Sequence, residues 1–384
     1  MTVLHRFAVT AVVAVLLSQV VACGGPQRAK PAALTKIEST QSASVEWSAN
    51  AGKSSKRDAV RLSPFVSEKF VYAVDVDGKL SAFDRATGET EWTVELERNI
   101  TSGVSGDEKN LYVASGNGEV FAVSQSIGGI LWTSDVSSEV IAAPVAGPDF
   151  VVVRSIDGKV YALEKTSGER RWIYTYNVPA LSLHGNGRPT VVADGVLVGL
   201  DNGRLVALRG LDGRVFWEVT LGSNTGRSEV EKLSDLDADV QIFDPYIYAV
   251  NYQGSVAQID ATEGNVVWSS AISSVAGLAV TDQLVVVTDE FDVIKAFNRD
   301  DGESLWSQEV FANRRLTGPV ATDSDLIVVG DVQGFLHLLS SADGSIVGRV
   351  KTGVGALAGR PVLRDGKIYV QGRTGKVASI DIGS

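Results

Sequence analysis

The chain has 384 residues and a formal net charge of −11, with one Cys and three His. A single Cys excludes an intrachain disulfide and any zinc or iron–sulfur site built from several cysteines. The excess of acidic residues disfavours nucleic acid as a partner, because phosphate binding needs clustered Lys and Arg. The hydrophobic content of 44% is typical of a folded globular protein.

Residues 1–22 have the features of a signal peptide: a cationic start, an apolar run from Phe7 to Leu17 and small residues before Cys23. The run is shorter than the roughly 20 apolar residues that span a bilayer as a helix. Val20-Val21-Ala22-Cys23 resembles the lipobox of bacterial lipoproteins, whose Cys becomes the acylated (palmitate-bearing) first residue of the mature protein. The alternative is a plain signal peptide. Residues 23–44, rich in small and polar residues, are expected to be the acylated Cys and a flexible tether.

The Trp residues mark an internal repeat. Six of them follow a Gly by four residues, and Gly344 precedes Gly348 in the same way, where an eighth Trp would fall. Neighbouring Trp residues are 38–51 positions apart, which is the size of a propeller blade of four strands. The seven are Trp47, Trp92, Trp132, Trp172, Trp217, Trp268 and Trp306.

Each Gly-x-x-x-Trp is preceded by a hairpin pattern, as in residues 70–83, where two β-rich runs flank Asp77-Gly78. Asp-Gly and Asn-Gly are strong hairpin signals because tight turns need positive φ. In the sixth repeat Phe291-Asp292 stands at the turn without Gly, which predicts a different turn there.

These repeats predict an all-β fold, a single eight-bladed β-propeller of four-stranded antiparallel blades over residues 45–384. The hairpin at 367–381 has no Trp strand after it, and Trp47 has no hairpin before it. We therefore expect the N-terminal strand to join the C-terminal hairpin and close the ring, which removes exposed sheet edges. Each Trp is interpreted as a packing residue between blades, and the interface at Gly348 as the least tightly packed.

The repeat resembles that of pyrroloquinoline-quinone (PQQ)-type propellers, a group that includes quinone-dependent dehydrogenases. Those enzymes use a vicinal disulfide and a bound calcium, neither of which this sequence supports, so we expect no enzymatic activity, no cofactor and no metal. The anchor Cys, the eight blades, and the segments at 179–185, 226–237 and 334–338 together resemble the BamB family of lipoproteins. This resemblance implies a scaffold role in the outer-membrane β-barrel assembly machinery (the BAM complex).

The same resemblance implies an outer-membrane location, lipid-anchored and facing the periplasm, with the lipid as the only membrane contact. Its implied partners are the periplasmic domains of the central, BamA-like assembly protein and nascent outer-membrane β-barrel proteins. Two other hypotheses stay open: a PQQ-dependent dehydrogenase, and a propeller adaptor of another envelope complex.

The longest internal connections between repeats follow Trp172 and Trp217, so they should project side by side. One presents Leu181 and Leu183, and residues 229–239 of the other contain five acids and one Lys, a pairing suited to protein docking. On the residues alone, a solvated loop beside two core leucines explains the pattern equally well. The family resemblance adds the individual contacts, which are Leu181, Leu183, His184, Asp235 and Asp237.

His184 stands where the family pattern usually has Arg, and a neutral His would weaken one charge-assisted contact. His337 lies in an apolar strand, where a histidine is more often a satisfied structural residue than a ligand. Neither histidine has a Ser and an acid placed around it by the pattern, so the sequence indicates no catalytic residue.

Overall fold

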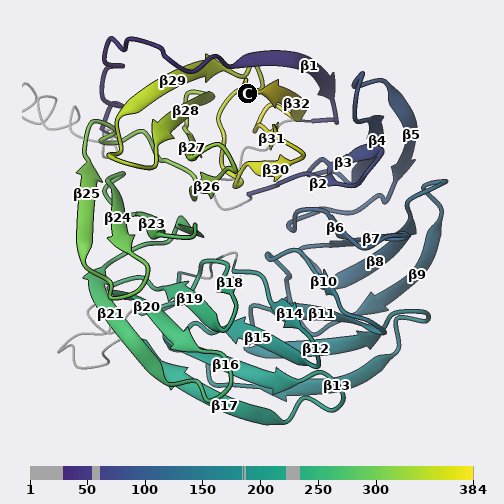
Figure 1. The fold of residues 1–384 in the computed structure, drawn as a ribbon. Coiled ribbons are helices and arrows are strands. Elements are labelled where there is room, and N and C mark those ends of the chain that lie inside the picture. The colour runs from purple at the N-terminus through teal and green to yellow at the C-terminus, as the bar shows by residue number, and fades with distance from the viewer. Residues whose placement is uncertain (1–28, 54–60, 184, 186, 222–233, 384) are drawn as a thin grey trace, which may run out of the picture. The chain divides into compact units, whose positions relative to one another are not determined.

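The computed structural model describes residues 29–53, 61–183, 185, 187–221 and 234–383. Residues 32–384 form one compact unit. Its 32 strands form eight antiparallel sheets of four strands around one axis (Figure 1). Across the described ranges we find no helix with the length and apolarity needed to span a membrane. The predicted eight-bladed propeller is confirmed.

In seven blades the four strands are consecutive, with the first next to the axis and the fourth on the outer rim (Figure 1). Blades 1 and 2 are β2 (Phe65–Val66), β3 (Phe70–Val74), β4 (Lys79–Asp84), β5 (Thr90–Glu95), β6 (Ser105–Gly106), β7 (Asn110–Ala114), β8 (Glu119–Ser124) and β9 (Ile130–Asp135). Blades 3 and 4 are β10 (Val145–Ala146), β11 (Phe150–Ser155), β12 (Lys159–Glu164), β13 (Arg170–Thr175), β14 (Thr190–Val192), β15 (Gly195–Gly199), β16 (Arg204–Arg209) and β17 (Val215–Thr220).

The remaining blades follow the same order, except that the last one takes its outer strand from the N-terminal part of the chain. Blades 5 and 6 are β18 (Gln241–Phe243), β19 (Tyr246–Val250), β20 (Gly254–Asp260), β21 (Val266–Ile272), β22 (Gly277–Val280), β23 (Leu284–Thr288), β24 (Ile294–Asn298) and β25 (Ser304–Gln308). Blades 7 and 8 are β26 (Val320–Ala321), β27 (Leu326–Gly330), β28 (Phe335–Ser340), β29 (Ile346–Lys351), β30 (Val362–Arg364), β31 (Lys367–Gln371), β32 (Lys376–Asp381) and β1 (Ser44–Asn50).

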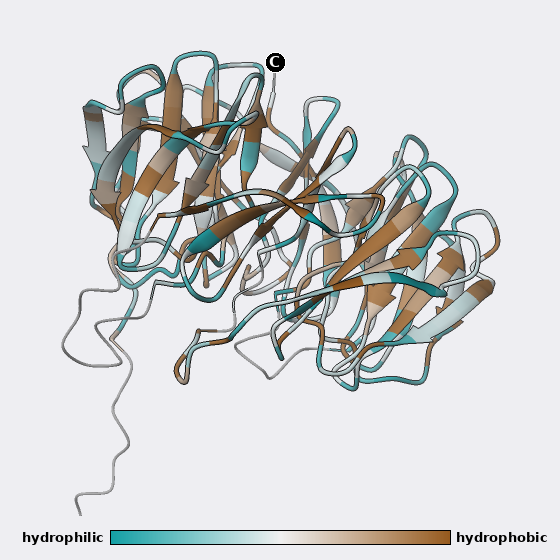
Figure 2. Ribbon diagram, turned by 90° about the horizontal axis from the view of Figure 1, so that it is seen from below, coloured by the Kyte–Doolittle hydropathy of each residue, from teal (hydrophilic) through white to brown (hydrophobic). Residues whose placement is uncertain are grey.

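The middle strands of the blades are buried on both faces, because each blade is covered by a neighbour on either side. All six residues of β11 are buried, whereas the outer strand β13 alternates between exposed and covered positions. Figure 2 shows this pattern as hydrophobic strands joined by hydrophilic turns. Eight buried hydrophobic clusters follow, and each combines residues of two neighbouring blades.

Each Trp packs on the second glycine turn of the following blade. The Nε1 of Trp92, for example, donates to the carbonyl of Gln125 at 2.9 Å, and a Cβ on Gly128 would lie 2.6 Å from the Trp92 ring. A glycine is required here on two counts, since Gly128 also has a φ of 68°. The seven pairs are Trp47–Gly88, Trp92–Gly128, Trp132–Gly168, Trp172–Gly213, Trp217–Gly264, Trp268–Gly302 and Trp306–Gly344.

The turn expected to differ in the sixth repeat has the ordinary geometry. Asp292 adopts a φ of 66°, the left-handed conformation that Gly78 has in the first repeat. The Asp292 N–H donates to Asp289 at 3.2 Å, as Gly78 donates to Asp75 at 3.3 Å. The prediction of a different turn was wrong, because Asp tolerates positive φ better than most residues with a side chain.

The ring closes as predicted, with β1 paired antiparallel to β32 in the order β1-β32-β31-β30. Gly348 in β29 faces this closure, and the prediction of a loose interface there is not supported. A Cβ on Gly348 would lie 2.7 Å from the backbone oxygen of Gln41, so the main chain occupies the space next to Gly348. The Gln41 side chain in turn donates to the carbonyl of Gly383 at 3.0 Å, which joins the two ends of the described chain.

The predicted flexible tether is too long at its C-terminal end. Ala32 donates its N–H to Ala312 at 2.9 Å, and the N–H groups of Thr40 and Gln41 both donate to Val347. The chain at Ala32, Thr40 and Gln41 is therefore bonded to the propeller and is not free tether. Cys23 lies outside the described residues.

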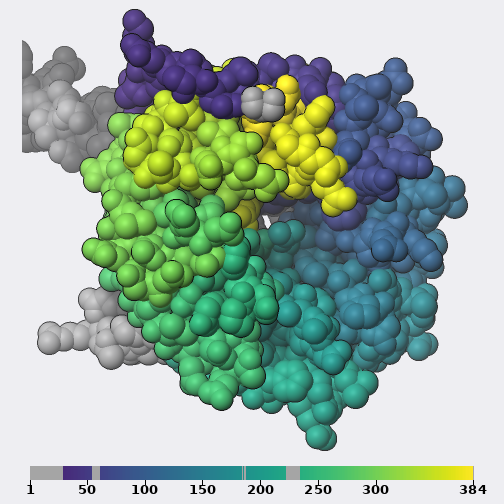
Figure 3. Space-filling view, viewed as in Figure 1, coloured from purple at the N-terminus to yellow at the C-terminus, as the bar shows by residue number. Residues whose placement is uncertain are grey.

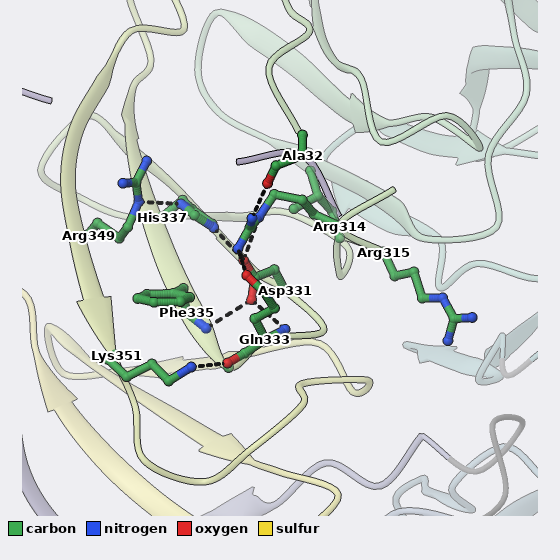
Figure 4. A network of polar contacts seen from close by, with 12 residues as sticks. Ala32, Arg314, Arg315, Asp331, Gln333, Phe335, His337, Arg349 and Lys351 are labelled. Atoms are coloured by element: carbon green, nitrogen blue, oxygen red, sulfur yellow. Dashed lines mark hydrogen bonds and ion pairs between the residues drawn. The ribbon is translucent and has the colours of Figure 1, made fainter. Parts of the chain in front are cut away.

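A buried polar network in blade 7 holds this segment (Figure 4). Arg314, only 1% exposed, donates to Asp331 at 2.8 Å and to the Ala32 carbonyl at 2.6 Å. His337 Nε2 lies 2.9 Å from Asp331, and its Nδ1 accepts from Arg349 at 3.1 Å, so Nε2 carries the proton. Burial lowers the pKa of His337. The interpretation of His337 as a satisfied structural histidine is confirmed.

We expect Gly128→Ala to destabilise the fold by more than a glycine substitution in open space. Positive φ alone costs a non-glycine residue about 1–2 kcal/mol, and overpacking against Trp92 adds about 1–3 kcal/mol. Gly366→Ala is the matched control, since Gly366 has a φ of 74° and no atom near the position of a Cβ. Urea unfolding of both variants measures the difference, and equal losses would show that the Trp contact contributes nothing.

Candidate functional site

The two long connections lie side by side, as the sequence predicts, because the second holds the backbone of the first. The carboxylate of Asp235 accepts from the Ser182 hydroxyl at 2.8 Å and from the N–H of Leu183. The Asp237 carboxylate accepts from the N–H of Gly185 at 3.0 Å. Residues 235–239, between β17 and β18, thus fix the course of the segment between β13 and β14.

A third acid extends the same pattern to the end of the loop. Asp239 accepts from both the N–H and the Nε of Arg188, each at 2.8 Å. Three alternate residues of one connection therefore bind successive positions of the other. We call residues 178–188 the docking loop and these three aspartates the aspartate clamp.

Leu181 and Leu183 are exposed, at 45% and 44% of their surface. Both were predicted as the apolar part of a docking surface, and the structure places them in solvent rather than in the core. Their exposure rules out the alternative in which they are core leucines beside a solvated loop. His184 lies outside the described residues, as do Glu229 and Glu231.

Asp235 and Asp237 were predicted to contact a partner as part of the acidic segment 229–239, and their burial does not support a place on the surface. Asp235 and the adjacent Leu236 are fully buried, and Asp237 is only 4% exposed. A buried carboxylate is costly unless donors satisfy it. Backbone N–H groups of the docking loop donate to one oxygen of each aspartate, whereas the other oxygen of Asp235, Oδ1, is buried without a hydrogen-bond partner. Both aspartates hold the loop by accepting its backbone N–H groups, and they present little surface to a partner.

A buried ion pair that sequence reasoning missed lies beneath the clamp. Arg154 in β11 pairs with Asp201 after β15, and Asp201 also accepts from the Tyr176 hydroxyl at 3.0 Å. Both charged residues are at most 6% exposed. The available signal was the charged Arg154 directly after three valines, in a strand buried on both faces.

The carboxylates of Asp201, Asp235 and Asp237 crowd together, with oxygen atoms within 4.8 Å of one another. Burial raises the pKa of Asp235, and burial together with the charge of Asp235 raises the pKa of Asp237 to about 7. Arg154 is the resident cation of this group, and its guanidinium already pairs with Asp201. The arrangement suits a structural support and positions no nucleophile for catalysis.

Between pH 5 and pH 8 the wild type should lose more unfolding free energy than the Asp237→Asn variant. The pKa of Asp237 is raised in the folded state, so the wild type loses stability as pH rises toward about 7 while the Asn variant does not. The difference should exceed about 1 kcal/mol, because one pKa unit corresponds to about 1.4 kcal/mol. Urea unfolding at the two pH values measures it.

Asp212→Asn provides the control for that experiment. The side-chain hydrogen bond from Arg209 lowers the pKa of Asp212 to about 2, so Asp212 does not titrate between pH 5 and 8. Its substitution should change stability equally at both pH values. A pH-independent effect of Asp237→Asn would contradict the raised pKa.

The fold and the site define a class of protein: an eight-bladed propeller with one long connection held in place by buried aspartates of the next. A family model described as outer membrane protein assembly factor BamB matches residues 28–97, 76–292 and 290–384. The chain therefore belongs to the BamB family of outer membrane protein assembly factors.

Individual relatives agree with this assignment. The BamB of Alkalilimnicola ehrlichii is 44% identical over 98% of this chain and 97% of its own length. That of Pseudomonas aeruginosa is 40% identical over 92% of both chains. Among solved structures, BamB from Moraxella catarrhalis matches with a TM-score of 0.82 and 28% identity, over 88% of this chain and all of its own.

A quinohemoprotein alcohol dehydrogenase from Comamonas testosteroni shares only the fold. It matches with a TM-score of 0.70 at 15% identity, over 89% of this chain and 77% of its own. The resemblance to PQQ-type propellers noted in the sequence is thus a likeness of architecture.

Proposed function

We propose that the protein is a non-enzymatic scaffold of the outer-membrane β-barrel assembly machinery, and that its docking loop binds the periplasmic domains of the central, BamA-like assembly protein. The observation that carries this proposal is the pair of exposed leucines, Leu181 and Leu183, on a loop fixed by the aspartate clamp. The names of the relatives, all assembly factors, support a scaffold over an enzyme.

The energetics of the docking loop favour protein binding. Burying an exposed leucine side chain contributes about 1.5–3 kcal/mol, so two neighbouring leucines supply a compact apolar anchor. The clamp removes most of the conformational entropy that a free loop would lose on binding, and such preorganisation increases affinity. Arg188 and the half-buried Asp239 fix the end of the loop in the same way.

In this proposal the aspartates are positioning residues. The resemblance to the family assigns Asp235 and Asp237 to the contact surface, whereas their burial places them under the loop. Their effect on a partner then passes through the backbone of Ser182, Leu183 and Gly185. The contact proposed for His184 remains a prediction from the resemblance.

We further propose that Cys23 carries a lipid anchor and that the propeller faces the periplasm from the outer membrane. Eight residues lie between Cys23 and Ala32, whose N–H is bonded to the propeller. A fully extended chain spans at most about 3.6 Å per residue, so this linker reaches about 30 Å. The linker length would then set the greatest distance between Ala32 and the membrane surface.

Nascent β-barrel proteins are proposed as a second kind of partner, through side chains of the outer strands. Phe216 and Val267, on the adjacent blades 4 and 5, are 57% and 51% exposed. Each is the extra residue of a β-bulge, which disrupts the regular ladder of the edge strand. These apolar side chains, more than the backbone edge, would contact an unfolded client.

Replacing both leucines, as Leu181→Ser with Leu183→Ser, should weaken binding to the central assembly protein at least about tenfold, because the apolar anchor is lost. The fold should be unaffected, since both side chains are exposed. Leu211→Ser is the matched control, as Leu211 is 70% exposed but belongs to the turn before β17. Co-purification from membranes measures binding, and unchanged recovery of the double variant would refute the assignment.

A further inference from the structure

A cavity of about 520 Å³ lies among the inner segments of the blades, and an unusual number of arginines line it. Figure 3 shows the opening at the centre of the ring. The arginines come from segments before blades 1, 4, 7 and 8 and from the turn between β31 and β32, so only ring closure brings them together. They are Arg61, Arg188, Arg315, Arg360 and Arg373.

Two of these arginines contact neutral groups. Arg61 donates to the carbonyl of Val275 at 3.2 Å, and Arg360 donates to the carbonyl of Pro319 at 3.0 Å. Among the described residues, neither guanidinium forms an ion pair with a carboxylate. Arg61 is exposed and Arg360 is half-buried, so both keep contact with solvent at the cavity wall. The surrounding protein nevertheless lowers the pKa of both arginines, because desolvation disfavours the charged guanidinium.

The acidic residues on the cavity wall are mostly engaged by the chain itself. Asp239 pairs with Arg188 at 2.6 Å. Asp289 accepts the N–H groups of Phe291 and Val293, and Asp292 those of Arg315 and Leu316.

Two further acids complete the wall. Asp237 belongs to the aspartate clamp, and its raised pKa reduces its negative charge near neutral pH. Glu290 is exposed. Within the part of the chain that the structure describes, no acid therefore compensates the charge of Arg61 or Arg360 by direct contact.

We propose that this axial cavity binds a small multivalent oxyanion, one that carries several phosphate or carboxylate groups, with Arg61 and Arg360 as its main ligands. The planar guanidinium donates two parallel hydrogen bonds to a phosphate or carboxylate, which is the geometry that such ligands match best. A concave site with protein walls also concentrates the positive potential. This site is separate from the leucines of the docking loop, and the proposal does not depend on the proposed function.

Calorimetric titration of the soluble mature chain with inorganic pyrophosphate, and separately with citrate, tests the proposal at constant ionic strength. We expect one saturable site for at least one of the two anions. The two arms separate phosphate from carboxylate recognition. Absence of saturable binding for both would overturn the proposal.

Substitution then assigns the site to the cavity. Arg61→Gln with Arg360→Gln should weaken the binding at least tenfold. Arg98→Gln is the matched control, because Arg98 is an exposed arginine paired with Glu119 away from the cavity, and it should bind like the wild type. Equal affinity in the double variant and the control would place the anion elsewhere and refute the proposal.

A measurement on the unmodified protein covers the case in which the double variant does not fold. Phenylglyoxal modifies accessible arginines, and mass spectrometry reports the extent at each one. The bound anion should protect Arg61 and Arg360 and leave the modification of Arg98 unchanged. If the anion left the extent of modification unchanged at Arg61 and Arg360 as well as at Arg98, the result would contradict the proposal.

Discussion

The contact of each Trp with the glycine turn of the next blade is the interaction on which the rest of this structure depends. A four-stranded blade is apolar on both faces of its middle strands and has no core of its own. Its hydrophobic residues are covered only when two neighbours are present, and the eight buried clusters each join one pair of blades. The indole both covers that junction and binds a carbonyl across it, so register and burial are fixed together.

The closure of the ring uses a different device for the same purpose. Between blades 7 and 8 the N-terminal chain runs where Gln41 meets Gly348, so main chain contacts the position at which the other repeats have Trp. The buried Arg314 and Asp331 then hold the chain before Gln41 against blade 7. The missing eighth Trp therefore follows from the path of the N-terminal segment.

A rigid ring allows its connections to differ without cost to the fold. The two longest internal connections combine into one unit, in which buried aspartates hold a loop that presents Leu181 and Leu183. The arginines around the axial cavity come mostly from other connections. They create a positive potential in the cavity, away from the exposed leucines. The docking loop and its clamp come from consecutive connections on either side of blade 4. The arginines come from both ends of the chain and meet only after ring closure.

The sequence predicted the ring well because the repeat has local causes. The Gly before each Trp and the Asp-Gly pairs predict where tight turns fall. Their regular spacing predicts eight blades, and the unpaired strand at Trp47 predicts the closure. It predicted exposure of Leu181 and Leu183 correctly, with support from the family resemblance.

The errors came from contacts that depend on tertiary structure. The sequence and the family resemblance made Asp235 and Asp237 contact residues of an acidic docking segment. Their burial is explained only by the backbone N–H groups of the opposing loop, although the adjacent Leu236 was a hint. The tether was overestimated because long-range backbone hydrogen bonds, and not local propensity, hold Ala32, Thr40 and Gln41 on the propeller.

The central claim is that the docking loop, and no other exposed apolar site, contacts the central assembly protein. Photo-cross-linking in intact membranes tests it most directly, with a photoreactive residue at position 183 and, in parallel, at position 211. The account predicts a cross-link to the central assembly protein from position 183 and none from position 211. Equal cross-linking from both positions, or a different partner at position 183, would contradict it.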